Sequence, residues 1–302
     1  SKLHASDPAA TRDSVQVERL RAAGAIVVGK TTAPEFGYTA ITRNLVQGVT
    51  RSPWGHDRSP GGSSGGSAAL LSAEVMPLVT GSDGGGSIRI PASWCGAFGL
   101  KPSFGRVPRG PSELWDYGKT SVYGPITKTV ADAALFMDQV VGPHELDPAS
   151  LPHPGYSYVQ RLQAAAPLSK LRIGFSPDLG YGVVQSDVAA CVAFATKVLE
   201  RLGHVLVDIP GGPPEMGGHW GLLNAYELGA ELSDKLPDRA AEVTRGLMHV
   251  ITLARDITPA WWRETALRRA QCVRWCGEVF ERCDVLVTPT MPYDPPAARG
   301  PL

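Results

Sequence analysis

Apolar and polar positions alternate along this chain at two spacings, and each spacing predicts its own kind of element. Residues 13–23 place their apolar side chains on one face of a helix, and Gly24 suits the left-handed position after it. The apolar run from Ala25 to Val28 predicts a short buried strand. A second run, from Val75 to Thr80, predicts another buried strand that ends at a loop from Gly81 to Ser87.

The second half of the chain repeats this alternation more regularly. The elements predicted there are a helix from Thr129 to about Val141, strands at 171–175, 205–209 and 285–288, and helices at 186–203 and 258–282. The strand–helix–strand run from 171 to 209 predicts a β–α–β unit. Together these elements favour an α/β fold with a largely buried sheet.

Composition excludes several classes of function. The chain has 302 residues, with 29 basic and 29 acidic side chains, so it lacks the positive charge that nucleic-acid binding needs. No apolar stretch reaches the length of a membrane span. The five cysteines are an odd number at irregular spacing, which favours a reducing compartment and predicts a cytoplasmic protein. Cys272 and Cys276 lack the further ligands of a metal site, so we expect no metal.

One motif matches a nucleotide-binding pattern but sits in the wrong context. Residues 24–31 fit the phosphate-loop pattern G-x4-G-K-[ST]. A phosphate loop leads directly into a helix, whereas Pro34 disfavours helix at the residue before it. The sequence therefore favours a strand and a turn here, and a nucleotide-binding protein stays only an alternative.

A second motif resembles the nucleophile elbow of α/β-hydrolases, G-x-S-x-G, with Ser64 as its serine. That elbow requires a strand immediately before it, and residues 57–61 contain Pro60 and Gly61 instead. The nearest candidate bases, such as His56 and His144, lie in polar loops. A Ser–His–Asp hydrolase is thus the second interpretation, not the first.

Two glycine- and serine-rich segments carry the strongest chemical signal, at residues 59–67 and 81–91. Each adjoins a predicted strand or helix, unlike a flexible linker. Three glycines directly before Ser87 permit backbone conformations that side chains forbid. Such a loop can turn several N–H groups toward one point, as the stabilisation of an oxyanion requires.

These segments resemble the amidase signature family. The resemblance runs through residues 29–36, 60–66, 83–91, 95–96, 99–106, 124–125, 129–132 and 288–290. It implies a mixed, largely buried β-sheet covered by helices on both faces. It also implies one amidase signature domain over residues 1–302, incomplete at both ends. The implied activity is hydrolysis of a carboxylic or aryl amide to an acid plus ammonia or an amine.

The resemblance also implies the roles of individual residues. Ser87 is the nucleophile, and Ser63, after a cis peptide bond from Gly62, bridges it to a neutral lysine. The remaining roles are an oxyanion hole from the N–H groups of Gly84, Gly85, Gly86 and Ser87, and loop support from Ser64, Asp83 and Arg89. This Ser–Ser–Lys mechanism requires no cofactor. The expected partner is a small-molecule amide, with neither nucleic acid nor membrane; a homodimer and an amidotransferase subunit stay open.

The lysine is where this sequence departs from the family. The family's catalytic lysine lies several tens of residues upstream of Lys30, at a position that would fall before Ser1. Lys30 and Lys101 both read as structural turn residues. We therefore expect little hydrolysis from these residues by themselves, and a non-catalytic binding protein derived from an amidase is a further alternative.

Overall fold

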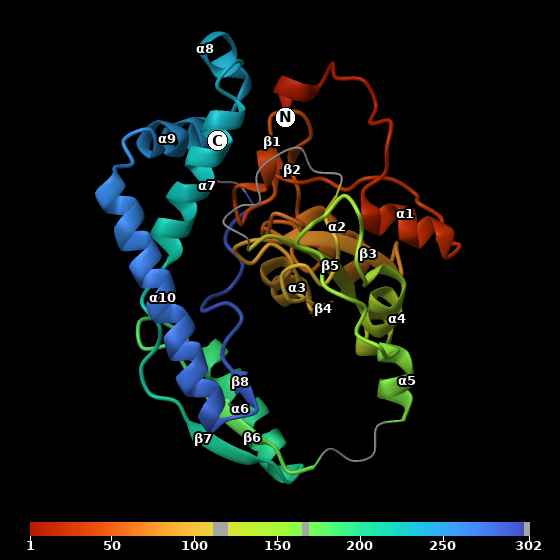
Figure 1. The fold of residues 1–302 in the computed structure, drawn as a ribbon, viewed down its shortest axis with the longest axis vertical. Coiled ribbons are helices and arrows are strands. Elements are labelled where there is room, and N and C mark those ends of the chain that lie inside the picture. Colours follow the sequence, from red (N-terminus) through yellow and green to blue (C-terminus); the bar gives the residue numbers. More distant parts are fainter. Residues whose placement is uncertain (111–119, 165–168, 299–302) are drawn as a thin grey trace. The chain divides into compact units, whose positions relative to one another are not determined.

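The computed structural model of the chain describes residues 1–110, 120–164 and 169–298, and its elements are labelled in Figure 1. The chain divides into two compact units. The first comprises Ser1–Ala164, Leu222–Arg255 and Pro295–Leu302, and the second comprises Ala165–Gly221 and Asp256–Asp294. Each unit has its own three-stranded sheet. The single domain expected over residues 1–302 stays a prediction.

The first unit holds both glycine- and serine-rich segments. Its helices and strands are α1 (Val15–Ala22), β1 (Arg43–Asn44), β2 (Gly48–Val49), α2 (Gly65–Ser72), β3 (Leu78–Asp83), α3 (Arg89–Cys95), β4 (Phe98–Gly99), β5 (Val122–Thr127), α4 (Val130–Val140), α5 (Tyr158–Gln163), α8 (Leu236–Arg239) and α9 (Arg245–Ala254). Single 3₁₀ turns occur at Lys2–His4, Glu35–Gly37 and Ala240–Glu242.

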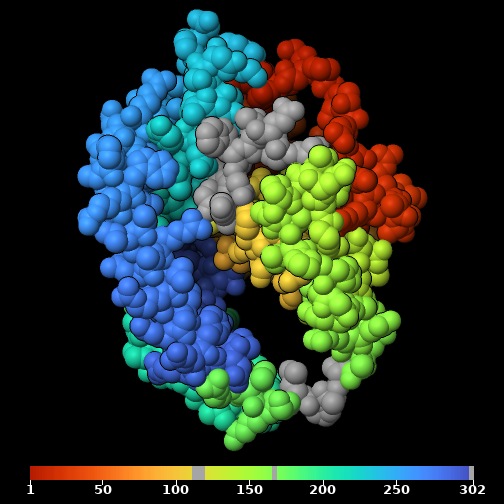
Figure 2. All heavy atoms as spheres, in the orientation of Figure 1, coloured from red at the N-terminus to blue at the C-terminus, as the bar shows by residue number. Residues whose placement is uncertain are grey.

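The sheet of the first unit is antiparallel, in the order β3-β5-β4. Asp83, the last residue of β3, is in register with Val122 of β5. Helices α2 and α3 contribute to one buried cluster with this sheet: Ala68, Leu71, Val79, Ile88, Ala92, Cys95 and Ile126. Only a small part of the orange and yellow segment that includes these elements is visible on the face drawn in Figure 2. This cluster packs helices α2 and α3, which continue from the two serine-bearing segments, against the sheet.

Helix α4 begins where the sequence predicted. The hydroxyl of Thr129 accepts a hydrogen bond from the N–H of Asp132, which satisfies one free donor of the first turn. Helix α4 buries Phe136, Met137 and Val140. Its C-terminal carbonyl groups are bound by the Arg19 side chain of α1. These contacts attach α1 and α4 to one another.

The second unit contains the predicted β–α–β unit. Its strands are β6 (Arg172–Phe175), β7 (Val205–Asp208) and β8 (Val285–Val287), and its helices are α6 (Ser186–Arg201) and α10 (Pro259–Arg282). All strand pairs in this sheet are parallel, in the order β7-β6-β8. Helix α7 (Gly217–Glu231) starts in the second unit and ends in the first.

The α/β class is confirmed, but two predicted strands need correction. Residues 25–28 are not a strand, and Ile26 and Val28 are 87% and 73% exposed. A run of apolar residues becomes a strand only when a neighbouring strand pairs with it, and none of the described strand pairs includes this run. The second strand starts at Leu78, not Val75, and continues through Gly81 to Asp83.

The later start of β3 has a local cause in the end of α2. Glu74 takes a left-handed conformation with φ 60°, and the N–H of Val75 binds the carbonyl of Leu70. This arrangement terminates a helix by satisfying its last carbonyl groups. Val75 therefore belongs to the helix end and is 62% exposed.

The α/β fold expected from the resemblance is present, and its strands are divided among separate sheets. The described strands form three sheets, of which β1-β2 is the smallest. In the second unit, Val205 and Val285 are 38% and 43% exposed. No helix in the described part of the chain is long and apolar enough to cross a membrane.

Candidate active site

The first serine segment leads into α2 through Gly61 and Gly62, which are both closely packed. The peptide bond between Gly62 and Ser63 is cis, which confirms the prediction from the resemblance. A side chain at Gly62 would lie 2.8 Å from the carbonyl oxygen of Thr39, so the backbone leaves room only for glycine. Ser63 is 6% exposed. The chain therefore holds the Ser63 hydroxyl in a packed setting, not on a flexible linker.

Ser64 follows as the residue that caps α2. Its hydroxyl lies 3.3 Å from the N–H of Ser82 and 3.4 Å from the carbonyl of the same residue. Residues 59–62 before it are not a strand, so the elbow geometry of an α/β-hydrolase is not formed. Ser64 thus connects α2 to strand β3, in keeping with the supporting role expected for it.

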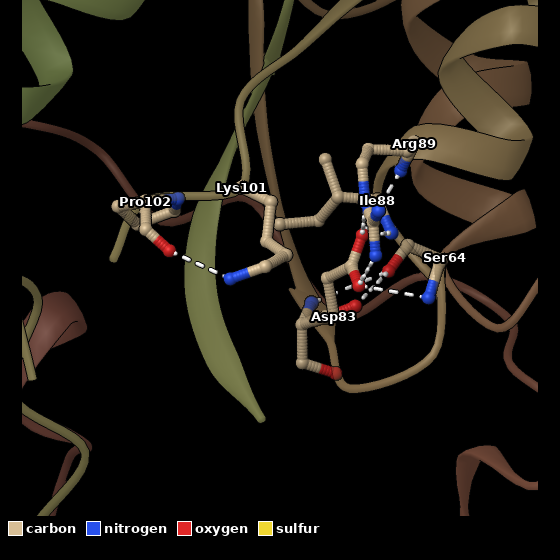
Figure 3. A network of polar contacts seen from close by, with 8 residues as sticks. Ser64, Asp83, Ile88, Arg89, Lys101 and Pro102 are labelled. Atoms are coloured by element: carbon tan, nitrogen blue, oxygen red, sulfur yellow. Dashed lines mark hydrogen bonds and ion pairs between the residues drawn. The ribbon is translucent and has the colours of Figure 1, made fainter. Parts of the chain in front are cut away.

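Asp83 organises the second serine segment. Its side chain is completely buried and accepts three hydrogen bonds from backbone N–H groups, those of Gly86, Ile88 and Arg89. Two more come from the Arg89 guanidinium, from Nε at 2.9 Å and from a terminal nitrogen at 2.8 Å. Figure 3 shows the donors of Ile88 and Arg89 around the Asp83 carboxylate.

The charge state of Asp83 follows from this environment. Burial by itself raises the pKa of the carboxyl group, but the hydrogen bonds and charge of Arg89 and the backbone N–H donors lower it by more. The pKa of Asp83 is therefore below its ordinary value. In turn the pKa of Arg89 is raised, chiefly by its hydrogen bonds to Asp83. The pair is ionised across the physiological range.

The same contacts bear on the expected oxyanion hole. The N–H of Gly86 donates to Asp83 at 2.8 Å, so in this structure that N–H already has an acceptor. Gly86 has φ 127°, a conformation that glycine accepts readily. It therefore serves the shape of the loop. The N–H groups of Gly84, Gly85 and Ser87 stay as the proposed donors to an oxyanion.

The two catalytic segments are joined through their backbones. The N–H of Ser64 donates to the carbonyl of Ser87 at 3.2 Å. Ser87 accepts this hydrogen bond and Ser63 directly precedes its donor, so the backbones of the predicted nucleophile and its bridging serine lie close together. A hydrogen bond between the hydroxyls of Ser63 and Ser87 stays a prediction.

The sequence contains two lysines near the serine segments, Lys30 and Lys101. Lys30 is exposed and does not end a strand, contrary to the expectation from its neighbours. Lys101 is half-buried, and burial is the main cause that lowers the pKa of its ammonium group. The Lys101 ammonium donates to the carbonyl of Pro102 at 2.9 Å, a contact visible in Figure 3. Lys101 lies in an irregular segment, and the turn predicted for it is not formed at this residue.

Sequence reasoning missed the part of the site formed by Glu35 and Gly37. Glu35 is 4% exposed and accepts a hydrogen bond from the N–H of Thr244, at 2.8 Å. A Cβ atom at Gly37 would lie 3.2 Å from the hydroxyl oxygen of Ser63. The only signal was the presence of Glu35 and Phe36 within the resemblance, because a lone glutamate in a loop normally predicts an exposed side chain.

Comparison with known proteins decides the family. A family model described as Amidase matches residues 2–301. The chain belongs to the amidase signature family. An acylamidase of Rhodococcus erythropolis is 37% identical over 298 residues, covering 95% of this chain and 60% of that protein. A putative amidase, AmiB2, of Mycobacterium tuberculosis is 39% identical over 307 residues, covering 97% and 60%.

Solved structures support the same family membership. The crystal structure of a bacterial aryl acylamidase matches with a TM-score of 0.92 and 30% identity, covering 99% of this chain and 63% of that one. The chain therefore spans about 60% of the length of the curated amidases it matches.

Within the described residues, no group of three or more His, Cys, Asp or Glu side chains has the arrangement of a metal site.

Proposed function

We propose that the protein is an amide hydrolase that uses Ser87 as its nucleophile and acts on a carboxylic or aryl amide. The observation that carries the proposal is the loop at 83–89. A buried, ionised Asp83 holds this loop by three backbone N–H groups. Ser87 directly follows the three glycines of this loop, and its carbonyl accepts the N–H of Ser64.

The chemistry follows from these positions. The Ser87 hydroxyl attacks the carbonyl carbon of the amide, and its proton passes to Ser63. By resemblance to the family, a neutral lysine completes this relay and returns the proton to the departing nitrogen. Water then releases the acid from the acyl-enzyme. The N–H groups of Gly84, Gly85 and Ser87 are the proposed donors to the negative oxygen, and each such donor contributes roughly 100-fold in rate.

The substrate class comes from the relatives. The acylamidase of R. erythropolis and the bacterial aryl acylamidase are named for amides with an acyl group, in one case on an aromatic amine. We propose an anilide or related aryl amide for this protein, with the acid and the amine as products. The binding partner of this protein is then a small-molecule amide. Sedimentation of the full gene product tests whether the protein forms a homodimer.

A cytoplasmic location is proposed from the cysteines. All of them are free thiols: Cys95, Cys191, Cys272, Cys276 and Cys283. Free thiols are typical of a reducing compartment.

The test of the proposed function is active-site labelling of the full gene product. A fluorophosphonate should acylate Ser87 alone, and the same protein should hydrolyse an anilide. Ser87→Ala should lose both reactions. Ser64→Ala is the matched control because its hydroxyl contacts Ser82, so label should still reach Ser87. Mass mapping that places the label on Ser64, or finds none, would refute the assignment.

A further inference from the structure

The turn at 35–38 lies against the bridging serine. Gly37 has φ 68°, and the preceding Phe36 has φ 52°, which side chains rarely adopt. A Cβ at Gly37 would be 3.2 Å from the Ser63 hydroxyl oxygen and 3.6 Å from its Cβ. The backbone of Gly37 therefore forms part of the wall around the Ser63 side chain.

This turn is held from its other side by the buried carboxylate of Glu35. One carboxylate oxygen accepts the N–H of Thr244, the residue that caps α9. The bond joins positions separated by 209 residues of sequence. A carboxylate at a helix N-terminus is favoured because free N–H groups there carry partial positive charge. Glu35 thus anchors the turn to α9.

The apolar side chains beside Glu35 complete this anchor. Phe36 and Tyr38 pack against a buried cluster from the 3₁₀ turn at Lys2–His4, the helices α7, α8 and α9 and the residues between these helices: Leu3, Leu228, Leu232, Leu236, Val243, Leu247 and Ile251. Burial raises the pKa of the Tyr38 phenol, in keeping with this packing. The turn is therefore fixed on three sides, by the cluster, by α9 and by Ser63.

Such rigid support is more than the turn's own backbone needs. Its internal hydrogen bonds run from Gly37 to Pro34 and from Tyr38 to Glu35. They close the turn without the Glu35 carboxylate. A carboxylate that is 4% exposed is costly to bury, and its second oxygen has no hydrogen-bond partner among the described residues.

We infer that Glu35 is a positioning residue for catalysis: by anchoring the turn to α9, it sets the place of Gly37 and so of the Ser63 hydroxyl. This inference rests on the proposed function, because Ser63 must carry a proton from Ser87. The Glu35 side chain does not itself touch the reacting atoms in this role. Loss of the anchor lets the turn shift and misplaces the relay hydroxyl.

The test compares glycine variants that differ in one respect. Gly37→Ala adds a methyl group against Ser63, whereas Gly48→Ala adds one at φ 77° with nothing within 4 Å. Both substitutions impose similar backbone strain. We expect the rate of fluorophosphonate labelling at Ser87 to fall about tenfold or more in Gly37→Ala and less than about twofold in Gly48→Ala, per folded molecule.

Glu35 is tested by removal and by conservative replacement in the full gene product. Glu35→Ala should slow labelling about tenfold and lower kcat for an anilide with little change in KM. Glu35→Gln keeps an acceptor for Thr244 and should recover most of the loss. Melting temperatures give the folded fraction, so that a purely structural effect appears as lower stability with an unchanged labelling rate.

The outcomes separate the two proposals. If the wild-type protein takes label on Ser87 and all variants do so equally fast, the role of Glu35 is overturned and the proposed function stands. Equal loss in Glu35→Gln and Glu35→Ala also overturns the role of the anchor. If the wild-type protein takes no label, both proposals fall.

Discussion

Arg89 binds the carboxylate of Asp83 at two points, with Nε 2.9 Å from one oxygen and a terminal nitrogen 2.8 Å from the other. Asp83 ends strand β3 and Arg89 begins helix α3, so the pair spans the loop that carries Ser87. Two-point pairs of this kind fix geometry as well as charge. The Asp83 side chain is wholly buried, while that of Arg89 is 46% exposed. The loop is therefore held mainly from its buried end.

Replacement of Asp83 should disable the loop. Asp83→Asn removes the negative charge and replaces one acceptor oxygen with an NH₂ group. That group faces N–H donors of the backbone or of Arg89, so several hydrogen bonds are lost. We expect a stability loss of about 3 kcal/mol and a labelling rate at Ser87 reduced about 100-fold. Urea unfolding and fluorophosphonate labelling measure the two effects.

The matched control is Asp57→Asn. The Asp57 carboxylate is 82% exposed and lies 3.5 Å from Arg58, so its loss should cost less than about 1 kcal/mol. Equal stability losses in the two variants would contradict the role given to Asp83.

The pKa of Asp83 predicts how stability changes in acid. Burial raises this pKa, but Arg89 and the backbone donors lower it by more, so the pKa is below its ordinary value. A lowered carboxyl pKa stabilises the folded state above the unfolded pKa, and this contribution is lost as pH falls through the folded pKa. As the pH falls below the ordinary pKa of an aspartate, the wild-type protein should therefore lose more stability than Asp83→Asn.

Urea midpoints at a series of pH values provide the measurement. Other lowered carboxyl groups, such as Asp138 and Asp284, titrate in both proteins and cancel in the difference. Parallel pH profiles for the two proteins would show that Asp83 has no lowered pKa.

Arg19 should be the residue that fixes α1 to the end of α4. Its guanidinium donates to four carbonyl groups, at 2.7, 2.9, 3.1 and 2.7 Å, and these belong to Val140, Val141, Gly142 and Pro143. Arg19→Ala leaves the carbonyls at a helix end without this donor, and we expect a loss of about 2 kcal/mol. Arg19→Lys should lose part of that because one ammonium cannot reach all four carbonyls.

The control lies on the same helix. Arg21 forms an exposed ion pair with Asp13 at 3.0 Å, with exposures of 61% and 41%. Arg21→Ala should change stability by less than about 1 kcal/mol, as measured by urea unfolding. If Arg19→Ala proves equally mild, the carbonyl contacts contribute nothing to the fold.

The sequence predicted those features that depend on local residues alone. Thr129 and Asp132 mark the start of α4, and the alternation from 171 to 209 marks the parallel pair of β6 and β7. The cis bond at Gly62 came from the family resemblance. These signals are short and carry their own geometry, so one sequence suffices to read them.

Other features depend on partners distant in sequence, and the pattern could not show them. The run at 25–28 is as apolar as a true strand, but strand formation needs a neighbour. From the sequence, the N–H of Gly86 could donate to an oxyanion or to Asp83. The structure shows that this N–H donates to the Asp83 carboxylate. Likewise nothing near Glu35 in the sequence indicates Thr244 as its partner.

The cysteines give a last prediction, which reports on the core beneath the site. Cys95 is fully buried, and burial raises the pKa of its thiol to about 12, although a hydrogen bond with Ser72 opposes this shift. The reactive species is the thiolate, so Cys95 should not react with iodoacetamide at pH 8. Cys191 is exposed and should react first. Cys276 is also exposed, but burial of its thiol and the neighbouring Cys272 raise its pKa, so it should react more slowly.

The reaction of Cys95 should follow the loss of the site. Its sulfur donates to the carbonyl of Pro60 at 3.4 Å, within the serine segment that leads into α2. Modification therefore requires that the packing under Pro60 and α2 opens. In increasing urea, mass mapping should find Cys95 modified over the same range in which fluorophosphonate labelling of Ser87 disappears. Modification of Cys95 in the absence of urea, with labelling of Ser87 intact, would show that the core and the site open independently.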